Sequence, residues 1–361
     1  MSKYYFSFFV FVFLSITSCS IKHNMPNSCS PNKVVHDNTF QVYVDQNGDF
    51  YPDNWVFDYK PQPKNAGGKN GAYSLTTIAA FPYSPDYLTE NLQDAKLNTL
   101  KSISEKFNSK DRVFIFVHGF NNNKEKADTA YNTLEKQIDF KPEDGLIKFY
   151  WDGLYTKQSI GALKIWKKAC GYSQLAGERG LRSILNQFNN KEIIIISHSR
   201  GASVVLSALS DGPYQQSFIE NTREYHNVSV HQQPRLSENN NTIKLLMLAP
   251  AVGYVDFREI DYYTNSPNSY RQFSDQIKSI HLTVNKNDNI LKKYIKVLSD
   301  KHNPTDLGYN ISTFENLSPN YPRMSMTSFD SLKSHDFNKY IKDDRFLPML
   351  NKVLNSNNSS L

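Results

Sequence analysis

Short runs that are apolar on both faces constrain the fold of this chain most. Arg112–Val117 reads RVFIFV and Glu192–Ile196 reads EIIII, so successive residues of both runs are apolar. A strand buries both faces only in a sheet that helices cover on both sides, which is typical of parallel sheets. Residues 175–188 and 201–209, in contrast, carry apolar side chains at helical spacing. The pattern predicts an α/β fold with a mostly parallel central sheet.

The remaining elements follow the same alternation. Residues 40–81 contain the extended runs FQVYV, NWVFDY and YSLTTIAAF, separated by clusters such as QNGD, and are expected to form strands and turns. Further strands are expected at 146–151, 243–248, 280–284 and 323–329. Helices are expected at 92–107, 127–138, 257–263, 290–298 and 337–354.

The amino terminus has the parts of a secretory signal. Lys3 precedes an apolar run, Tyr4–Ile16, and small residues lead to Cys19. The apolar run is shorter than the roughly 20 residues that span a bilayer as a helix, so residues 1–18 are expected to be a cleaved signal peptide.

The end of this signal, Ile16-Thr17-Ser18-Cys19, resembles the lipobox of bacterial lipoproteins. The resemblance implies a diacylated Cys19 that anchors the protein to a membrane of the bacterial cell envelope, without indicating the leaflet. Two acyl chains hold a protein stably on a bilayer. An ordinary signal peptide that ends near a cysteine is the alternative.

The rest of the chain divides into a tether and one large domain. Residues 19–38 are polar and are expected to be a lipidated tether. Residues 39–361 are expected to form the domain, with N-terminal strands in 39–88. Two polar stretches, 211–241 and 303–330, interrupt the pattern as insertions. Insertions of this length are lids, binding loops or disordered surface, and all three remain open.

Charge and cysteine content exclude some classes of function. The 41 basic residues exceed the 35 acidic ones by six, and both signs are scattered, which is unlike the basic face of a nucleic-acid binder. Cys19, Cys29 and Cys170 lack the paired spacing of metal ligands, so no metal site is expected. If Cys19 is acylated, Cys29 either pairs with Cys170 or remains a free thiol.

The segment 193–201, IIIISHSRG, carries the strongest chemical signal. Its order of strand, small-x-Ser-x-Gly and helix is the context of a nucleophile elbow, a sharp turn that exposes a serine above the sheet. Ser199 is then the nucleophile. The flanking positions must be small, and Ser197 and Gly201 meet this requirement, although serine replaces the commoner glycine at the first. An ordinary strand-to-helix turn is the alternative.

From Arg112 to the carboxyl terminus the chain resembles the alpha/beta-hydrolase superfamily. The likeness is to poorly characterised bacterial domains with an HGF-N loop and an S-H-S-x-G elbow. It implies that the backbone N–H groups of Phe120 and Arg200 form an oxyanion hole, and that Gly119 lets the backbone approach. His118 is then expected to orient the loop, with a catalytic role as the alternative.

The superfamily order of serine, acid and histidine selects the other two catalytic candidates. Asp288 follows the strand expected at 280–284, where the superfamily acid commonly lies, and Asp256 is the alternative. His335 lies between the expected last strand and last helix, and is preferred to His302 as general base.

These residues predict a serine hydrolase of ester or related acyl bonds in a small-molecule or lipid substrate. The scheme needs neither a cofactor nor a metal. An acyltransferase or peptidase with the same triad is one alternative, and a catalytically inactive hydrolase-like lipoprotein used for binding is another. No sequence feature selects a particular substrate or an oligomeric state.

Overall fold

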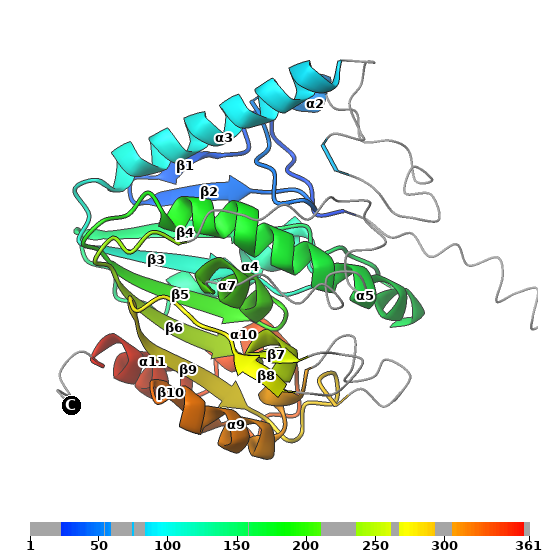
Figure 1. Cartoon of the computed structure of the whole chain (residues 1–361), viewed down its shortest axis with the longest axis vertical. Coiled ribbons are helices and arrows are strands. Elements are labelled where there is room, and N and C mark those ends of the chain that lie inside the picture. The colour runs from blue at the N-terminus through cyan, green and yellow to red at the C-terminus, as the bar shows by residue number, and fades with distance from the viewer. Residues whose placement is uncertain are drawn as a thin grey trace, which may run out of the picture.

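The computed structural model of the chain describes residues 23–53, 55–58, 74–75, 84–157, 159–210, 236–260, 267–292 and 305–356. The centre of this described part is an eight-stranded sheet (Figure 1). In spatial order its strands are β1 (Lys33–His36), β2 (Thr39–Tyr43), β4 (Asp144–Tyr150), β3 (Arg112–Val117), β5 (Glu192–His198), β6 (Thr242–Leu248), β9 (Ile277–Val284) and β10 (Met324–Ser328). Neighbouring strands are parallel except β1 and β2. The predicted α/β fold with a mostly parallel sheet is confirmed.

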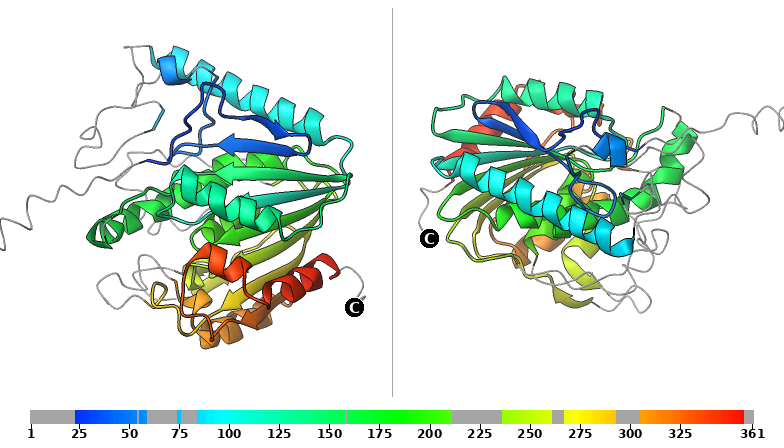
Figure 2. Two further views of the ribbon diagram at one scale, coloured as in Figure 1. Left: turned by 180° about the vertical axis from the view of Figure 1, so that it is seen from behind. Right: turned by 90° about the horizontal axis from the view of Figure 1, so that it is seen from above.

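Helices cover both faces of the sheet (Figure 2). One face carries α3 (Pro85–Phe107), α5 (Ser159–Leu175), α6 (Arg182–Leu185) and α7 (Gly201–Leu209). The other face carries α4 (Lys124–Glu135), α10 (Phe337–Ile341) and α11 (Phe346–Leu354). A π-helical segment, Ala176–Leu181, joins α5 to α6, so the helical region predicted at 175–188 begins earlier, at Ser159.

Alternation along the central strands builds two cores. In β3, Val113 and Ile115 pack into the core under α5 and α7, whereas Phe114 and Phe116 pack into the core under α4. The four isoleucines 193–196 of β5 divide between the two cores in the same way. Each fully buried side chain of this size stabilises the fold by roughly 1.5–3 kcal/mol, which explains why both faces of these strands are apolar.

The helix predicted at 337–354 is interrupted after Ile341 and resumes at Phe346. Two further local predictions have the wrong type of element. The run 54–59 predicts a strand, but Trp55–Asp58 form the short helix α2, and the buried Trp55 indole N–H donates to the Ser28 carbonyl oxygen at 2.8 Å. The helix predicted at 257–263 is replaced by β7 (Arg258–Ile260), which pairs with β8 (Pro267–Tyr270). Periodicity cannot distinguish helix from strand in such short runs, so tertiary partners decide.

The segment predicted as a tether is folded over its described part. Residues 33–36 form β1, and Asn24 is buried. Asn32 accepts a hydrogen bond from the Tyr43 N–H at 2.6 Å and donates to the Tyr51 carbonyl oxygen at 2.9 Å. The polar residues that suggest a linker therefore satisfy backbone groups of the domain, which corrects the predicted boundary.

Several other predictions fall wholly or partly outside the described residues. These are the signal peptide, the lipidation site Cys19, most of the run 73–81, most of the insertion 211–241 and the end of the helix predicted at 290–298. The second insertion, 303–330, is described from residue 305 and includes α9 (Ile311–Leu317) as well as β10. Among the described helices, none has the length and apolar character to cross a bilayer.

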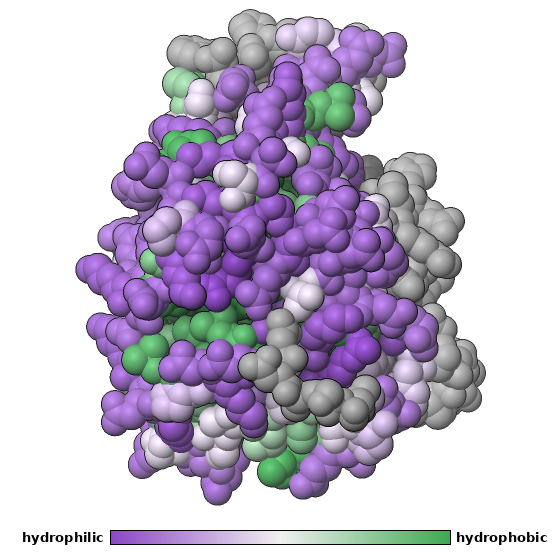
Figure 3. Space-filling view, turned by 90° about the vertical axis from the view of Figure 1, so that its left-hand side faces the viewer, coloured by the Kyte–Doolittle hydropathy of each residue, from purple (hydrophilic) through white to green (hydrophobic). Residues whose placement is uncertain are grey.

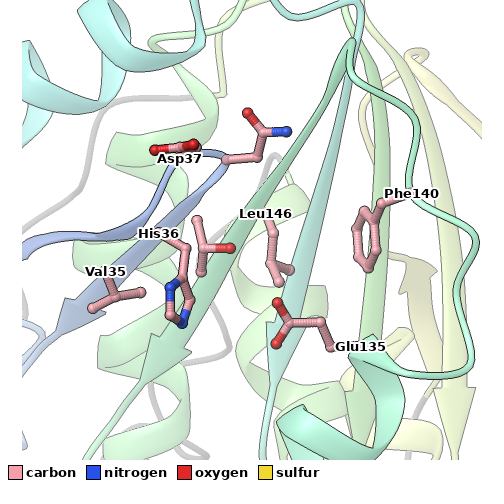
Figure 4. A pocket seen from close by; sticks show the side chains of 8 residues that line it. Val35, His36, Asp37, Glu135, Phe140 and Leu146 are labelled. Carbon is pink, nitrogen blue, oxygen red and sulfur yellow. The ribbon is translucent and has the colours of Figure 1, made fainter.

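The edge at which the parallel strands begin shows a mainly hydrophilic surface with scattered apolar areas, the largest of them toward the lower left of the view (Figure 3). A pocket of about 540 Å³ lies near this edge, beside the turn between β1 and β2, and its lining includes His36, Asp37 and Leu146 (Figure 4). Glu135, which also lines it, is paired with Lys148 at 2.7 Å. The candidate catalytic residues follow the opposite ends of the strands.

Candidate active site

Ser199 occupies a sharp turn between β5 and α7. Its φ of 52° lies in the left-handed region, which is costly for a residue other than glycine and recurs at functional sites. The Ser199 N–H donates to the Leu248 carbonyl oxygen at 2.9 Å, which ties the turn to β6. A Cβ on Gly201 would lie 2.6 Å from the His118 carbonyl oxygen, so only glycine fits there. The turn therefore has the geometry of a nucleophile elbow.

The three side chains predicted as the triad lie in one line of hydrogen bonds. His335 Nε2 is 2.8 Å from Ser199 Oγ, and His335 Nδ1 is 2.7 Å from Asp288 Oδ2. Ser199 follows β5, Asp288 follows β9, and His335 lies between β10 and α10. The carboxyl ends of three parallel strands thus bring together residues up to 136 positions apart.

Several contacts hold the Asp288 carboxylate in a fixed orientation. Its Oδ1 accepts hydrogen bonds from the backbone N–H groups of Ile290 and Leu291, at 3.0 and 3.1 Å. The Tyr340 hydroxyl donates to Oδ2 at 3.4 Å, and the whole Asp288 residue is buried. Oδ2 is therefore aimed at His335, where it accepts the Nδ1 proton.

The alternative acid, Asp256, lies elsewhere. Its Oδ2 accepts the Gly253 N–H at 3.0 Å, and its Oδ1 is 4.0 Å from Nη2 of the buried Arg200. Asp256 therefore lies beside Arg200, which is in the turn that carries Ser199, and not beside His335. The alternative base, His302, is outside the described residues.

The HGF loop, which consists of His118, Gly119 and Phe120, approaches the nucleophile closely. A Cβ on Gly119 would lie 2.7 Å from Ser199 Cβ, so this position requires glycine. In the parts of the chain that the structure describes, the Phe120 and Arg200 N–H groups have no protein acceptor. Both amides are thus available to a ligand, as an oxyanion hole requires. The Arg200 side chain turns away and donates to the Ala251 carbonyl oxygen at 2.9 Å.

His118 is buried beneath this loop. Its Nδ1 donates to the Gly119 carbonyl oxygen at 2.8 Å, and its Nε2 accepts the Trp151 N–H at 3.3 Å. Burial lowers the pKa of His118 to about 4, so the imidazole is neutral near pH 7. These contacts connect His118 to the loop backbone and to Trp151, the residue that follows β4.

A second buried histidine, His198, was not among the predicted site residues. Its Nε2 donates to the His335 carbonyl oxygen at 2.9 Å, and its ring stacks on Phe337 with centroids 4.6 Å apart. Burial lowers the pKa of His198 well below its usual value. Its position next to Ser199 in SHSRG was the available signal, but its partner lies 137 residues away.

Backbone strain gathers at this edge of the sheet. Asn121, Leu154, Ser199 and Ala249 all have φ between 45° and 56°, and they follow β3, β4, β5 and β6 respectively. Strain of this kind costs on the order of 1–3 kcal/mol per residue and persists only where the surrounding structure imposes it. Asn190 and Asn240, which precede β5 and β6 at the opposite edge, have similar φ angles, so four of the six described non-glycine residues of this kind lie at the carboxyl edge.

The low pKa of His118 predicts a pH-dependent stability. The unfolded chain binds this proton near pH 6.5, whereas the folded protein binds it near pH 4. The free energy of unfolding should therefore fall as the pH is lowered from 6.5 to 4, and His118 should contribute about 3 kcal/mol of that fall. Urea unfolding across this range, compared with His118→Gln, measures it. An identical pH dependence in both proteins contradicts the prediction.

The fold and this arrangement together define a class of protein. A mostly parallel sheet with helices on both faces, and a serine on a sharp turn from a central strand into a helix, is the architecture of an alpha/beta hydrolase. Residues 94–302 match the model of the family described as "Alpha/beta hydrolase of unknown function (DUF900)", and the chain belongs to this family.

Solved structures also show similarity to this chain. An acetylxylan esterase aligns with 14% identity over 68% of this chain and 100% of its own, with a TM-score of 0.31. An uncharacterized protein from Bacillus cereus ATCC 10987 aligns with 14% identity over 81% of this chain and 78% of its own, with a TM-score of 0.27. No curated protein matches the chain.

Proposed function

We propose that this alpha/beta hydrolase is a serine hydrolase that cleaves ester or related acyl bonds. The observation that carries the proposal is the continuous line from Ser199 Oγ through His335 to Asp288, with contacts of 2.8 and 2.7 Å. These distances allow proton transfer between the nucleophile and its base without rearrangement. The buried Asp288 carboxylate in turn orients the base, so the three residues have the arrangement of a catalytic triad.

The geometry supports a two-stage reaction. Ser199 Oγ attacks the acyl carbon of the substrate while His335 Nε2 takes the hydroxyl proton. The tetrahedral intermediate collapses, the bond to the leaving group breaks, and His335 returns the proton to that group. A water molecule then attacks the acyl-enzyme with His335 again as base, and Ser199 is regenerated. Asp288 stabilises the imidazolium that forms in each stage.

The negative charge that develops on the acyl oxygen needs donors that are already in place. In the proposal the N–H groups of Phe120 and Arg200 supply them, since both lie beside the nucleophile and have no acceptor in the described chain. Each donor of this kind contributes roughly 10²–10³ in rate. The glycine at position 119 is what permits the first of them to come close.

Labelling with a fluorophosphonate probe tests the proposal directly. The protein without its signal peptide is treated with the probe, and the adduct is located by peptide mass spectrometry. We expect an adduct on Ser199 that disappears in Ser199→Ala. Ser197→Ala is the matched control, because it removes the neighbouring buried hydroxyl, which has no hydrogen-bond partner in the described chain. Absence of any adduct in folded wild-type protein would favour a binding role for the scaffold.

We also propose that Cys19 is acylated and anchors the enzyme in the bacterial cell envelope. The lipobox-like Ile16-Thr17-Ser18-Cys19 after the apolar run supports this. In cells that export it, the full-length protein is expected to partition into the detergent phase, and Cys19→Ala is expected to move it to the aqueous phase. Cys29→Ala, which changes an exposed free thiol, should leave the partitioning unchanged. Unaltered partitioning of Cys19→Ala contradicts acylation.

A further inference from the structure

The first described residues of the chain contact His118, which lies beneath the HGF loop, and the residues that follow β4. Asn24 is buried, and its Nδ2 lies 3.2 Å from the Trp151 carbonyl oxygen and 3.3 Å from His118 Nε2. The Asn24 backbone N–H also donates to Asp152 Oδ1 at 3.0 Å. His23 binds the other oxygen of the same carboxylate through its Nδ1. The N-terminal segment is thereby fixed to the loop that follows β4.

The contacts around His118 show which of its nitrogens carries the proton, and Asn24 supplies one of them. The Trp151 carbonyl oxygen accepts only, so the amide group that faces it must be the NH₂ of Asn24. The same NH₂ group reaches His118 Nε2, and the Trp151 N–H points to that nitrogen as well. Two donors directed at Nε2 require a lone pair there. The proton of neutral His118 is therefore on Nδ1.

The protonated Nδ1 in turn orients a peptide plane. Nδ1 donates to the Gly119 carbonyl oxygen at 2.8 Å, and the Asn122 side chain donates to the same oxygen at 3.2 Å. The described peptide bonds are all trans, so the Gly119 C=O and the Phe120 N–H point in opposite directions in one rigid unit. Holding the carbonyl oxygen on the His118 side fixes the direction of the Phe120 N–H.

The loop after β4 packs against the same peptide unit. A Cβ on Gly153 would lie 3.1 Å from the Gly119 carbonyl oxygen and 3.1 Å from Phe120 Cα. The Gly153 carbonyl oxygen accepts the Asn121 N–H at 2.9 Å. Asp152, which His23 and Asn24 hold, forms part of this loop. A displacement of the N-terminal segment would thus reach the HGF loop by two routes.

We propose that Asn24 is a positioning residue for catalysis, which helps to hold His118 in its Nδ1–H tautomer and orientation and thereby aims the Phe120 N–H at the reacting acyl oxygen. The inference rests on the proposed serine hydrolase function. It extends the site to a segment that the sequence pattern assigns to a tether. Asn24 acts through His118 and does not touch the substrate.

The test compares two substitutions of Asn24. Asn24→Leu keeps the approximate size and shape of the side chain, adds no charge and has no NH₂ to donate, whereas Asn24→Ala removes the group entirely. We expect both to lower the rate constant of fluorophosphonate labelling at Ser199 by about 10- to 100-fold, somewhat less than the loss of a whole oxyanion donor. For hydrolysis of p-nitrophenyl acetate, we expect kcat to fall with little change in KM. A role limited to filling space predicts that Asn24→Leu reacts like wild type, and this result overturns the inference.

Asn32→Ala is the matched control. Asn32 belongs to the same segment and its side chain is also tied to the domain by hydrogen bonds, but its partners belong to Tyr43, Tyr51 and Thr99 rather than to the HGF loop. Its labelling rate at a temperature well below unfolding should equal that of wild type. An equal loss of rate in Asn32→Ala and Asn24→Ala would mean that general loosening of the segment explains the effect, and it contradicts the inference.

A second measurement does not depend on whether the variants fold. Nitrogen-15 NMR of the wild-type protein reports which imidazole nitrogen of His118 is protonated, and we expect Nδ1. A proton on Nε2 overturns the inference even if Ser199 reacts normally with the probe. If wild-type protein is folded but Ser199 does not react, the proposed function itself fails. The two failures are therefore distinguishable.

Discussion

Ser199→Ala is expected to lower the turnover of an ester substrate by about 10⁶, as removal of the nucleophile does in a serine protease. The substitution keeps the Cβ and removes only the hydroxyl, so the strained turn at φ 52° and its hydrogen bond to Leu248 should persist. Steady-state hydrolysis of p-nitrophenyl esters, with circular dichroism and thermal unfolding as checks on the fold, measures the effect.

His335→Ala should produce a loss of similar size, because the serine hydroxyl is a poor nucleophile without its base. The double variant Ser199→Ala/His335→Ala should have nearly the same turnover as either single variant, since the losses caused by residues that act as a unit do not add. Normal turnover by folded Ser199→Ala would remove this serine from the mechanism. Additive losses would indicate that the two residues do not act together.

Asp288→Asn is expected to lower turnover by about 10⁴. The backbone N–H groups of Ile290 and Leu291 require an acceptor at Oδ1, so the new NH₂ group would face His335 Nδ1. His335 would then place its proton on Nε2, directed at Ser199, and could not accept the hydroxyl proton. The loss should appear in kcat.

Asp256→Asn is the control for this prediction. Asp256 is also buried and also caps a backbone N–H, but it lies beside Arg200 rather than His335. We expect its substitution to reduce thermal stability more than turnover, because it removes one partner of a buried charge pair. If Asp256→Asn abolishes turnover and Asp288→Asn does not, the acid of the triad is Asp256.

Local patterns were sufficient to predict the central part of the fold. A strand buried on both faces leaves its signature in consecutive residues, as in the isoleucines 193–196, and the helix at 201–209 begins and ends where its pattern indicates. The candidate nucleophile is similarly local, since the elbow needs only a strand, a small residue, Ser199 and Gly201. Chain order in the superfamily then led to Asp288 and His335, which the structure places in contact.

Features that depend on distant partners were not predictable. The hydrogen bond between Asn24 and His118 spans 94 residues, and that between His198 and His335 spans 137. A polar residue in a polar segment carries no local sign that it will be buried against a loop far along the chain. The same reason explains why Trp55 lies in a helical turn rather than in the predicted strand: its indole partner, Ser28, belongs to the segment interpreted as a tether.

The hydrogen bond between His23 and Asp152 has a consequence for membrane attachment through Cys19, which is proposed above. If Cys19 carries the lipid, four peptide steps separate the acylated residue from His23, and a fully extended chain covers at most about 14 Å in four steps. So short a connection would keep the edge of the sheet that holds Ser199 close to the lipid headgroups. It would also restrict rotation of the folded domain about the anchor. If the substrate is held in the same membrane, the two would meet by diffusion within the plane of the membrane, and the rate would depend on substrate density per unit area rather than on bulk concentration.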